Sequence, residues 1–369
     1  MQSWNEFIQT LAKRDAGAPA TETGAPARIG DVEVARGFGD RRAEFQAAMG
    51  HVAITDRSYR SVLTVSGTDR VAWLHNLVTQ DVKSICPGDG QYAFALNVKG
   101  RILFDLNVFV RTDEIQLDLD HRFRSAARAH LEKYVIMEDV TLAEPLAGQV
   151  RLGLVGPSAG AILAQAGMPQ APNLAILQSG SFVWQSAPAA VVRGDFCGPP
   201  AWEVSLPADR AIEFWQWCTD QAGAAPMGFD VAEALRIEAG IPAPATEINE
   251  NVLPAETGQL ARAVSFSKGC YLGQEVVERM RSRGVTARHL VRLTLTDPTP
   301  PPAGAEVLDA ENQPVGRVTS ACRRMVEPGC LALGYVKTVA ATPGTELVVT
   351  DGDRRLPATV TPAPVPADG

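Results

Sequence analysis

The segment after Gly284 is the part of the sequence that most constrains the fold. Over about 80 residues, short stretches rich in valine, leucine and threonine alternate with turns rich in glycine, proline and aspartate. Short strands at close spacing are typical of small barrels, in which each strand finds a partner on both sides. The sequence therefore predicts a small β-barrel over residues 286–369. The expected strands are His289–Leu295, Glu306–Leu308, Pro314–Ser320, Leu331–Val336, Glu346–Thr350 and Leu356–Thr361.

The residues before this barrel alternate antiparallel strands with single helices. Residues 92–96 and 101–110 have strand character, and they flank the sequence Asn-Val-Lys-Gly at 97–100, which favours a tight hairpin turn. Strands interrupted by single helices predict an α+β fold in which helices cover one face of a sheet. We expect this body to span residues 34–285, with two subdomains that divide near 145–150.

Residues 1–33 precede the body and have a different composition. Trp4–Arg14 has a short helical pattern, and the following residues are rich in Ala, Gly, Thr and Pro, which is typical of a linker. The polar start lacks the apolar run of a signal peptide. No stretch of the chain approaches the roughly 20 apolar residues that a membrane helix needs. We therefore expect a cytoplasmic protein with no membrane partner.

Charge and cysteine content exclude several classes of function. The formal net charge is −8, which argues against a protein that coats nucleic acid, so nucleic acid is not expected as a direct partner. The six cysteines are scattered singly with no C-x-x-C pair. This argues against a disulfide framework, a zinc ribbon and a resident iron–sulfur cluster. The five histidines show no metal-ligand spacing, so no stable metal is expected.

The least ordinary stretch is Lys-Gly-Cys-Tyr-Leu-Gly-Gln-Glu at residues 268–275. Two glycines bracket Cys270, just ahead of residues with helical character. A thiol beside a lysine and close to a helix N-terminus lies in a positive field, which favours the reactive thiolate. The alternative is an unreactive cysteine that fills a gap beside a turn.

This stretch resembles the signature K-G-C-[YF]-x-G-Q-E of the YgfZ family, folate-binding relatives of the glycine-cleavage T-protein, and it matches every specified position. Further blocks are similar to the same superfamily: residues 65–82, the hairpin 97–108, and Leu235–Pro242 at a helix exit. The resemblance covers roughly residues 34–361. It implies a T-protein-like body around a central folate channel, closed by the C-terminal barrel.

The resemblance also implies a function. Proteins similar to YgfZ bind folate and serve iron–sulfur enzymes, including enzymes that modify tRNA. We therefore expect a folate-binding protein that acts in iron–sulfur cluster assembly or maintenance, with client enzymes or assembly proteins as partners. The expected cofactor is tetrahydrofolate or a derivative. The alternative is a tetrahydrofolate-dependent aminomethyltransferase, methyltransferase or demethylase, and in that case the chain is a one-carbon transferase. A third reading is a folate-binding scaffold without chemistry.

The site residues are carried over from the resemblance. Cys270 is the expected working thiol, as a redox-sensitive group or a transient iron–sulfur ligand, with Lys268 tuning its charge. Gly269 and Gly273 shape the turn, and Tyr271 either packs over the ligand or plugs a domain interface. The predicted folate contacts are Arg236, Glu238, Tyr271, Arg60, Gly269, Gly273 and Gln274.

Two pairs of residues sharpen this assignment. Arg236 and Glu238 lie two residues apart on one expected helix, so they face different sides, and one would reach the pocket while the other anchors the helix. Aminomethyltransferases resemble one another in an Asp-Asp pair on the hairpin, one carboxylate of which works near the folate nitrogen that accepts the one-carbon unit. This chain has Phe104-Asp105 instead. Asp105 is therefore a candidate for proton handling, and the broken pair favours the YgfZ assignment.

Overall fold

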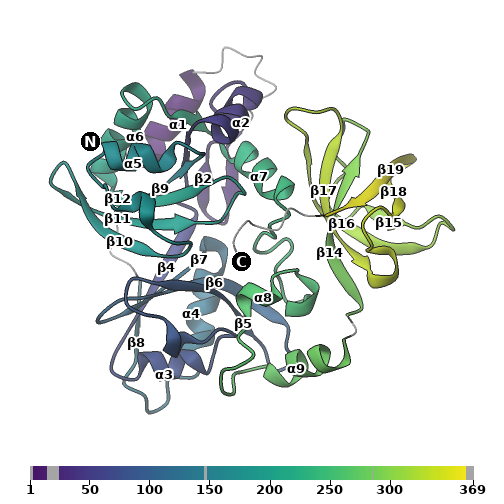
Figure 1. Ribbon diagram of the computed structural model, residues 1–369, viewed down its shortest axis with the longest axis horizontal. Helices are drawn as coiled ribbons and strands as arrows, with labels where there is room; N and C mark the ends of the chain where they lie inside the picture. The colour runs from purple at the N-terminus through teal and green to yellow at the C-terminus, as the bar shows by residue number, and fades with distance from the viewer. Residues whose placement is uncertain (1–2, 15–24, 145–147, 285, 363–369) are drawn as a thin grey trace. The chain divides into compact units, whose positions relative to one another are not determined.

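The computed structural model of the protein describes residues 3–14, 25–144, 148–284 and 286–362 (Figure 1). The chain forms two compact units, each assembled from three separate segments. The first unit contains the residues up to 71, 84–91 and 107–233, and the second contains 72–83, 92–106 and the residues from 234. The helices are α1 Trp4–Arg14, α2 Arg41–Gly50, α3 Arg70–His75, α4 Arg124–Glu132, α5 Ala159–Gln165, α6 Ala208–Asp220, α7 Phe229–Glu238, α8 Leu260–Ala263 and α9 Gln274–Arg283.

A six-stranded sheet with helices packed against it forms the core of the first unit. Its order is β10-β11-β12-β9-β3-β13, antiparallel except for the parallel pair β13–β3. The N-terminal helix α1 belongs to this core, because Trp4 packs edge-on against Trp215 of α6 and its indole N–H donates to buried Asp56. The strands are β3 Ala53–Asp56, β9 Gln149–Val155, β10 Ser179–Trp184, β11 Ala187–Gly194, β12 Ala201–Pro207 and β13 Ala225–Met227.

A second sheet has five strands in the order β5-β6-β7-β4-β8. The predicted hairpin turn is present between β5 and β6. Gly100 has a φ of +69° and its N–H donates to the Asn97 carbonyl, while the Asn97 side chain accepts from the N–H groups of Lys99 and Arg101. The strands are β4 Arg60–Ser66, β5 Gly90–Leu96, β6 Ile102–Val110, β7 Ile115–Asp120 and β8 Thr141–Ala143, and the short strands β1 Ala27–Ile29 and β2 Val32–Val34 pair separately.

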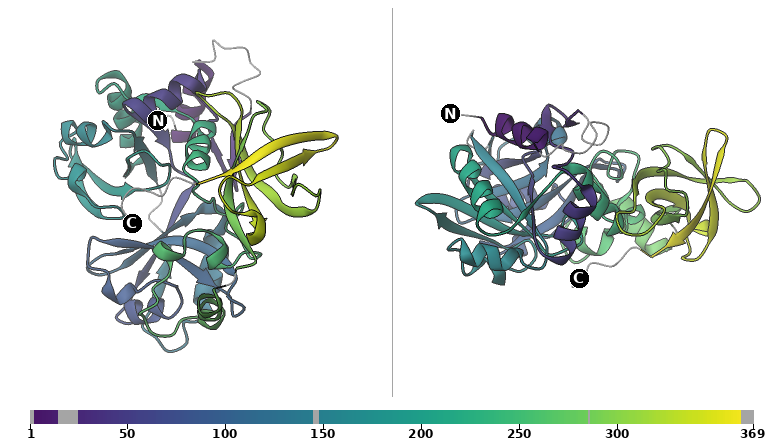
Figure 2. Two further views of the ribbon diagram at one scale, coloured as in Figure 1. Left: turned by 45° about the vertical axis from the view of Figure 1, so that its right-hand side comes forward. Right: turned by 90° about the horizontal axis from the view of Figure 1, so that it is seen from above.

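The C-terminal strands close into a barrel in the order β14-β17-β16-β15-β18-β19 (Figure 2, green to yellow). All six strands contribute to its apolar core, which consists mainly of valine, leucine and alanine side chains. The barrel and the mixture of sheets and helices confirm the predicted α+β fold. The strands are β14 Arg288–Leu295, β15 Glu306–Leu308, β16 Pro314–Arg323, β17 Cys330–Lys337, β18 Glu346–Asp351 and β19 Arg354–Thr361.

Of the predicted linker, residues 15–28, the part 15–24 lies outside the described residues, and the last two residues of the linker belong to strand β1. Within the ranges that are described, none of the helices combines the length and the hydropathy required to cross a membrane.

Candidate functional site

Lys268 is buried, and backbone oxygens surround its ammonium group. Nζ donates to the carbonyls of His75, of Val78 at 2.7 Å and of Gln80 at 2.9 Å. The ammonium also lies 5.0 Å from the centre of the Tyr271 ring. Burial lowers the pKa of Lys268 to about 8. The lysine that the sequence placed beside the thiol thus donates its hydrogen bonds to the loop 75–80.

Cys270 lies on a short arch, residues 269–271, that is attached to this loop at both ends. Lys268 binds the loop at one end, and at the other the N–H of Leu272 donates to the Asn76 carbonyl at 3.1 Å. The Cys270 thiol is free and exposed. Gly269 faces open space, since a Cβ placed there would meet nothing within 4 Å. The arch therefore presents the thiol to reagents in solution.

Tyr271 anchors the arch in the interior of the second unit. Its ring lies in an apolar cluster with Phe94, Ile248 and Tyr335, and it is 7% exposed. Burial raises the pKa of its phenol. Its backbone N–H donates to Oε1 of Gln274 at 3.2 Å. The ring is thus packed inside the second unit, and Gln274 supports the backbone of the arch. Both alternatives for Tyr271 stay predictions.

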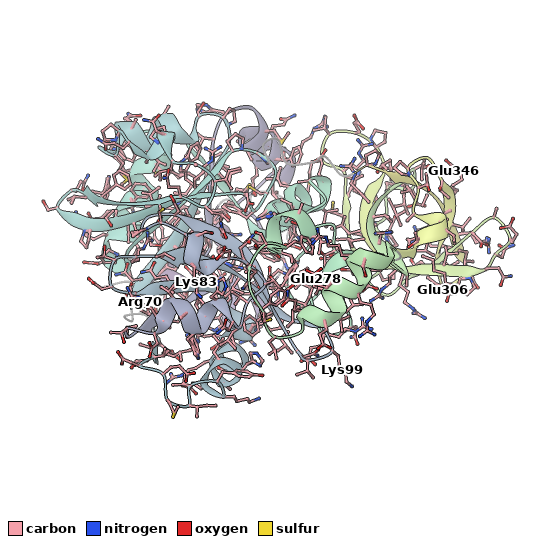
Figure 3. All side chains as sticks on the ribbon, turned by 60° about the horizontal axis from the view of Figure 1, so that its bottom comes forward. Arg70, Lys83, Lys99, Glu278, Glu306 and Glu346 are labelled. Atoms are coloured by element: carbon pink, nitrogen blue, oxygen red, sulfur yellow. The ribbon has the colours of Figure 1, made fainter. Side chains whose placement is uncertain are left out.

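The start of α9 packs closely against the hairpin turn. Gly273 precedes α9 with a φ of +82°, and a Cβ there would lie 2.6 Å from the Asn97 carbonyl oxygen. Gly100 stands in a similar position, with Val276 of α9 only 2.7 Å from the place of its missing Cβ. Figure 3 marks Lys99 in this turn and Glu278 on α9. A side chain at Gly273 would meet the backbone of the turn and one at Gly100 would meet the Val276 side chain, so the close packing of α9 on the turn favours glycine at both positions.

Asp105 is buried on β6, and the Tyr92 hydroxyl on neighbouring β5 donates to its Oδ2 at 2.9 Å. Consecutive residues of a strand point to opposite faces. Phe104, which is 2% exposed, therefore projects from the other face of β6. Phe104, which stands where aminomethyltransferases have another aspartate, therefore does not face the Asp105 carboxylate. The loss of the Asp-Asp pair is thus weaker evidence against one-carbon chemistry than the sequence suggested.

Arg236 forms a buried ion pair in the second unit. Its guanidinium donates to Glu247, which is fully buried, at 3.3 Å, and to the Ser320 hydroxyl of the barrel at 2.8 Å. The same guanidinium also donates to the Ile241 carbonyl just after α7. Arg236 thus connects the segment after α7 to Glu247 and to the barrel, and a folate contact by Arg236 stays a prediction.

Glu238 lies near the end of α7 and is half-buried. Burial raises the pKa of its carboxyl, while Arg324 and Arg292 oppose this shift. Arg292 of β14 also donates to the Glu238 backbone carbonyl. A pocket contact by Glu238 stays a prediction.

Arg60 belongs to a buried charge network in the first unit. It binds Asp118 at 2.8 Å, and Arg151 bridges Asp118 to Glu203, which in turn binds Arg57 at 2.8 Å. Burial alone would raise the pKa of Asp118, but Arg151 and Arg60 hold it well below its usual range. The network thus keeps the buried Asp118 carboxylate charged.

Sequence reasoning missed most members of this network. The available signal was a charged residue on an otherwise apolar strand, because such a residue is buried only with a partner. Glu203 in Ala201–Pro207 fits this pattern, whereas Asp118 in Ile115–Asp120 is masked by Gln116 and Asp120 on the same strand. Their arginine partners lie on distant strands and carry no comparable local signal.

The predicted site residues thus fall into two groups. Those of the second unit are Lys268, Gly269, Cys270, Tyr271, Gly273, Gln274, Asp105, Arg236 and Glu238, whereas Arg60 lies in the first unit. In the described part of the chain, no group of three or more His, Cys, Asp or Glu side chains is arranged to hold a metal ion. The reactive groups that the second unit offers therefore include an exposed thiol and a buried carboxylate that accepts from a part-buried phenol.

Comparison with known proteins gives matches along nearly the whole chain. Residues 27–268 match the family described as the GCVT N-terminal domain, and residues 288–365 match the glycine cleavage T-protein C-terminal barrel domain. The mitochondrial aminomethyltransferase of Gallus gallus is 30% identical over 331 residues, which are 85% of this chain and 81% of that protein.

Further relatives extend the similarity. The aminomethyltransferase of Thermosynechococcus vestitus is 27% identical and covers 91% of this chain and 90% of its own. A putative chloroplastic transferase of Arabidopsis thaliana is 25% identical over 94% of this chain and 76% of its own. The crystal structure of the glycine cleavage system aminomethyltransferase T from Bartonella henselae has the same fold, with a TM-score of 0.85, 23% identity, and coverage of 97% of this chain and 96% of that one.

These matches overturn the main function predicted from the sequence, a role in iron–sulfur cluster assembly or maintenance. The relatives are named aminomethyltransferases, which agrees with the alternative instead. The prediction was wrong because it gave one eight-residue segment and the Phe104 substitution more weight than the similarity of the remaining chain. Phe104 lies on the opposite face of its strand from Asp105, so it was a poor indicator of function.

Proposed function

The chain belongs to the glycine-cleavage T-protein family, and on this premise we propose that it is a folate-dependent one-carbon transferase of the aminomethyltransferase type. Its substrates in this proposal are an aminomethyl donor and tetrahydrofolate. The match extends over both family domains, which supports the whole activity and not only folate binding. The observation that carries the proposal is the buried Asp105 carboxylate on the family's hairpin, which accepts a hydrogen bond from the part-buried Tyr92 hydroxyl.

The chemistry of this pair suits a secondary amine that gains a one-carbon unit. A carboxylate can take the proton that such a nitrogen releases and can stabilise the positive charge that develops on it. The Tyr92 hydroxyl fixes one carboxylate oxygen, which limits the rotation of the Asp105 side chain. Burial of the Asp105 carboxylate strengthens both effects, because water screens charge less there. Asp105 is thus the proposed proton-handling group.

The finer predictions made from the sequence, on subfamily, location and site residues, stay predictions. Membership of the YgfZ branch rests on residues 268–275 and stays a prediction, as does the cytoplasmic location. The predicted folate contacts also stay predictions; these are Arg60, Arg236, Glu238, Gly269, Tyr271, Gly273 and Gln274. For Cys270 the prediction is a chemical role of its exposed thiol.

The test replaces the aminomethyltransferase of a reconstituted glycine cleavage system with this protein. We expect glycine- and tetrahydrofolate-dependent formation of methylenetetrahydrofolate. Asp105→Asn should lower kcat by about 10²–10⁴-fold, the usual range for a lost acid–base group, with the KM for tetrahydrofolate little changed. Asp113→Asn, at an exposed position of the β6–β7 turn, is the matched control and should behave as wild type.

Two outcomes decide against the proposal. If the wild-type protein binds tetrahydrofolate but forms no methylenetetrahydrofolate, the scaffold reading replaces it. If Asp105→Asn retains full activity, the carboxylate is not the proton-handling group. Cys270→Ser in the same assay separates a thiol that takes part in transfer from one that does not.

A further inference from the structure

Lys268 is a buried cation held by the backbone of a distant segment. Its three acceptors are main-chain carbonyls at residues 75, 78 and 80, roughly 190 positions earlier in the chain. A primary ammonium has three N–H donors and no acceptor. Lys268 therefore has a full set of partners, and all of them belong to one loop. The interaction orders a chain segment, because carbonyls that converge on one point fix the loop conformation.

This loop is the link between Lys268 and β5. Val78 forms an isolated bridge with Ala95 of β5. The N–H of Thr79 donates to the Phe94 carbonyl at 2.9 Å, and its hydroxyl accepts from the Phe94 N–H at 2.9 Å. Thr79 is fully buried. The position of the loop therefore sets the position of β5, the strand that carries Tyr92.

A second path leads from the same loop to the Tyr92 ring. Gln80, whose carbonyl binds Lys268, donates through its side-chain amide to the Arg262 carbonyl at 3.0 Å. The Arg262 guanidinium lies over the Tyr92 ring, 4.4 Å from its centre. Tyr92 in turn donates to Asp105. Both the strand and the ring of Tyr92 thus depend on the loop that Lys268 holds.

We propose that Lys268 is a positioning residue, whose ammonium fixes the loop 75–80 and through it the Tyr92–Asp105 pair. Its catalytic consequence rests on the proposed function, in which Asp105 handles the proton. The role is distinct from tuning Cys270, because the hydrogen bonds of the ammonium go to the loop carbonyls. A displacement of about 1 Å at a reacting group costs up to roughly 10²-fold in rate.

The first experiment measures the loop directly. In Lys268→Met, which keeps the length of the side chain and removes the donors, the amides of Thr79 and Phe94 should exchange hydrogen at least about tenfold faster. The barrel strand β14 serves as the internal reference and should be unchanged. Lys83→Met removes an exposed positive charge near the same loop and is the matched control. Unchanged exchange at Thr79 and Phe94 in Lys268→Met overturns the proposal.

Chemical rescue separates hydrogen-bond donation from charge and from packing. In Lys268→Ala, added propylammonium supplies the missing ammonium on a chain of matching length and should restore slow exchange of the loop amides. Tetramethylammonium carries the same charge without N–H donors and should not restore it. Equal rescue by both ions, or by neither, contradicts the carbonyl-binding role.

The activity readout distinguishes this proposal from the proposed function. Lys268→Met should lower kcat by roughly 10–100-fold with little change in the KM for tetrahydrofolate. Gln80→Leu leaves the lysine in place and removes the side-chain hydrogen bonds of Gln80, one to the Arg262 carbonyl and one from the Asp81 N–H. It should also lower kcat, and it keeps the test valid if Lys268→Met does not fold. If Lys268→Met shows fast hydrogen exchange of the loop amides but keeps the wild-type kcat, the proposed link between the loop and Asp105 is wrong. An inactive wild-type protein counts against the proposed function alone, because loop exchange still decides whether Lys268 orders the loop.

Discussion

The Arg236–Glu247 ion pair gives the sharpest test of what holds the second unit together. Glu247 is fully buried, and its carboxylate accepts from Arg236 at 3.3 Å, from the Ala243 N–H at 2.8 Å and from the Ser320 hydroxyl at 2.6 Å. In Arg236→Met the aliphatic part of the side chain is retained and the charge is lost. The Glu247 carboxylate then keeps two hydrogen-bond donors but has lost the cation that compensates its burial.

The expected cost follows from this burial. Removing one partner of a buried ion pair destabilises a protein by about 3–5 kcal/mol, because the remaining charge is left uncompensated. For a unit of this size, roughly 2–4 °C is lost per kcal/mol, so the midpoint of thermal unfolding should fall by about 6–20 °C. Calorimetry and urea unfolding of the full chain measure both quantities.

A second substitution tests the cause. Adding Glu247→Gln to Arg236→Met removes the stranded charge, so the double variant should be more stable than the single one by at least about 1 kcal/mol. Arg279→Met on the exposed side of α9 is the control and should stay within about 0.5 kcal/mol of wild type. A loss below about 1 kcal/mol in Arg236→Met, or additive losses in the double variant, would refute the reasoning.

Three further predictions follow from close packing, buried backbone groups and thiol exposure. Gly273→Ala should cost at least about 1–2 kcal/mol from its left-handed backbone alone, and more from the clash with the hairpin turn, whereas Gly269→Ala in open space should be near neutral; thermal unfolding compares them. Thr79→Val strands a buried carbonyl and a buried N–H and should cost about 2–4 kcal/mol in urea unfolding, and a loss below about 1 kcal/mol contradicts the hydrogen bonds described. Native alkylation at pH 8 followed by peptide mass analysis should label Cys270 rapidly and spare Cys197, whose pKa burial raises to about 12, and equal labelling rates would contradict the burial of Cys197.

Strand positions were predictable where turns used glycine, proline or asparagine. The six barrel strands and the hairpin at residues 97–100 follow from such signals. Strand β11, Ala187–Gly194, was missed because the turn before it contains Gln185 and Ser186, both with positive φ (46° and 72°). These residues rarely adopt that conformation, so the sequence has no hairpin signal there.

The site was predictable only in part for a related reason. A motif identifies residues such as Lys268 and Cys270, but it does not say which groups they contact. The acceptors of Lys268 are backbone carbonyls, and any residue type supplies a carbonyl. The sequence also does not indicate the Arg236–Glu247 ion pair. A loop after α7 brings the two side chains together, and no helical spacing relates them.

The assembly of the second unit from residues 72–83, 92–106 and the chain from 234 onward affects how the protein can be divided. Expressing the chain from residue 234 alone would yield a barrel and an arch whose lysine has lost its acceptors. A shorter N-terminal fragment would carry the loop 75–80 and β5 without the segment that orders them. A transplant of the arch into another protein must therefore include all three segments. A gene that is split or permuted should keep residues 83–92 and 106–234 continuous, because these stretches connect the three segments.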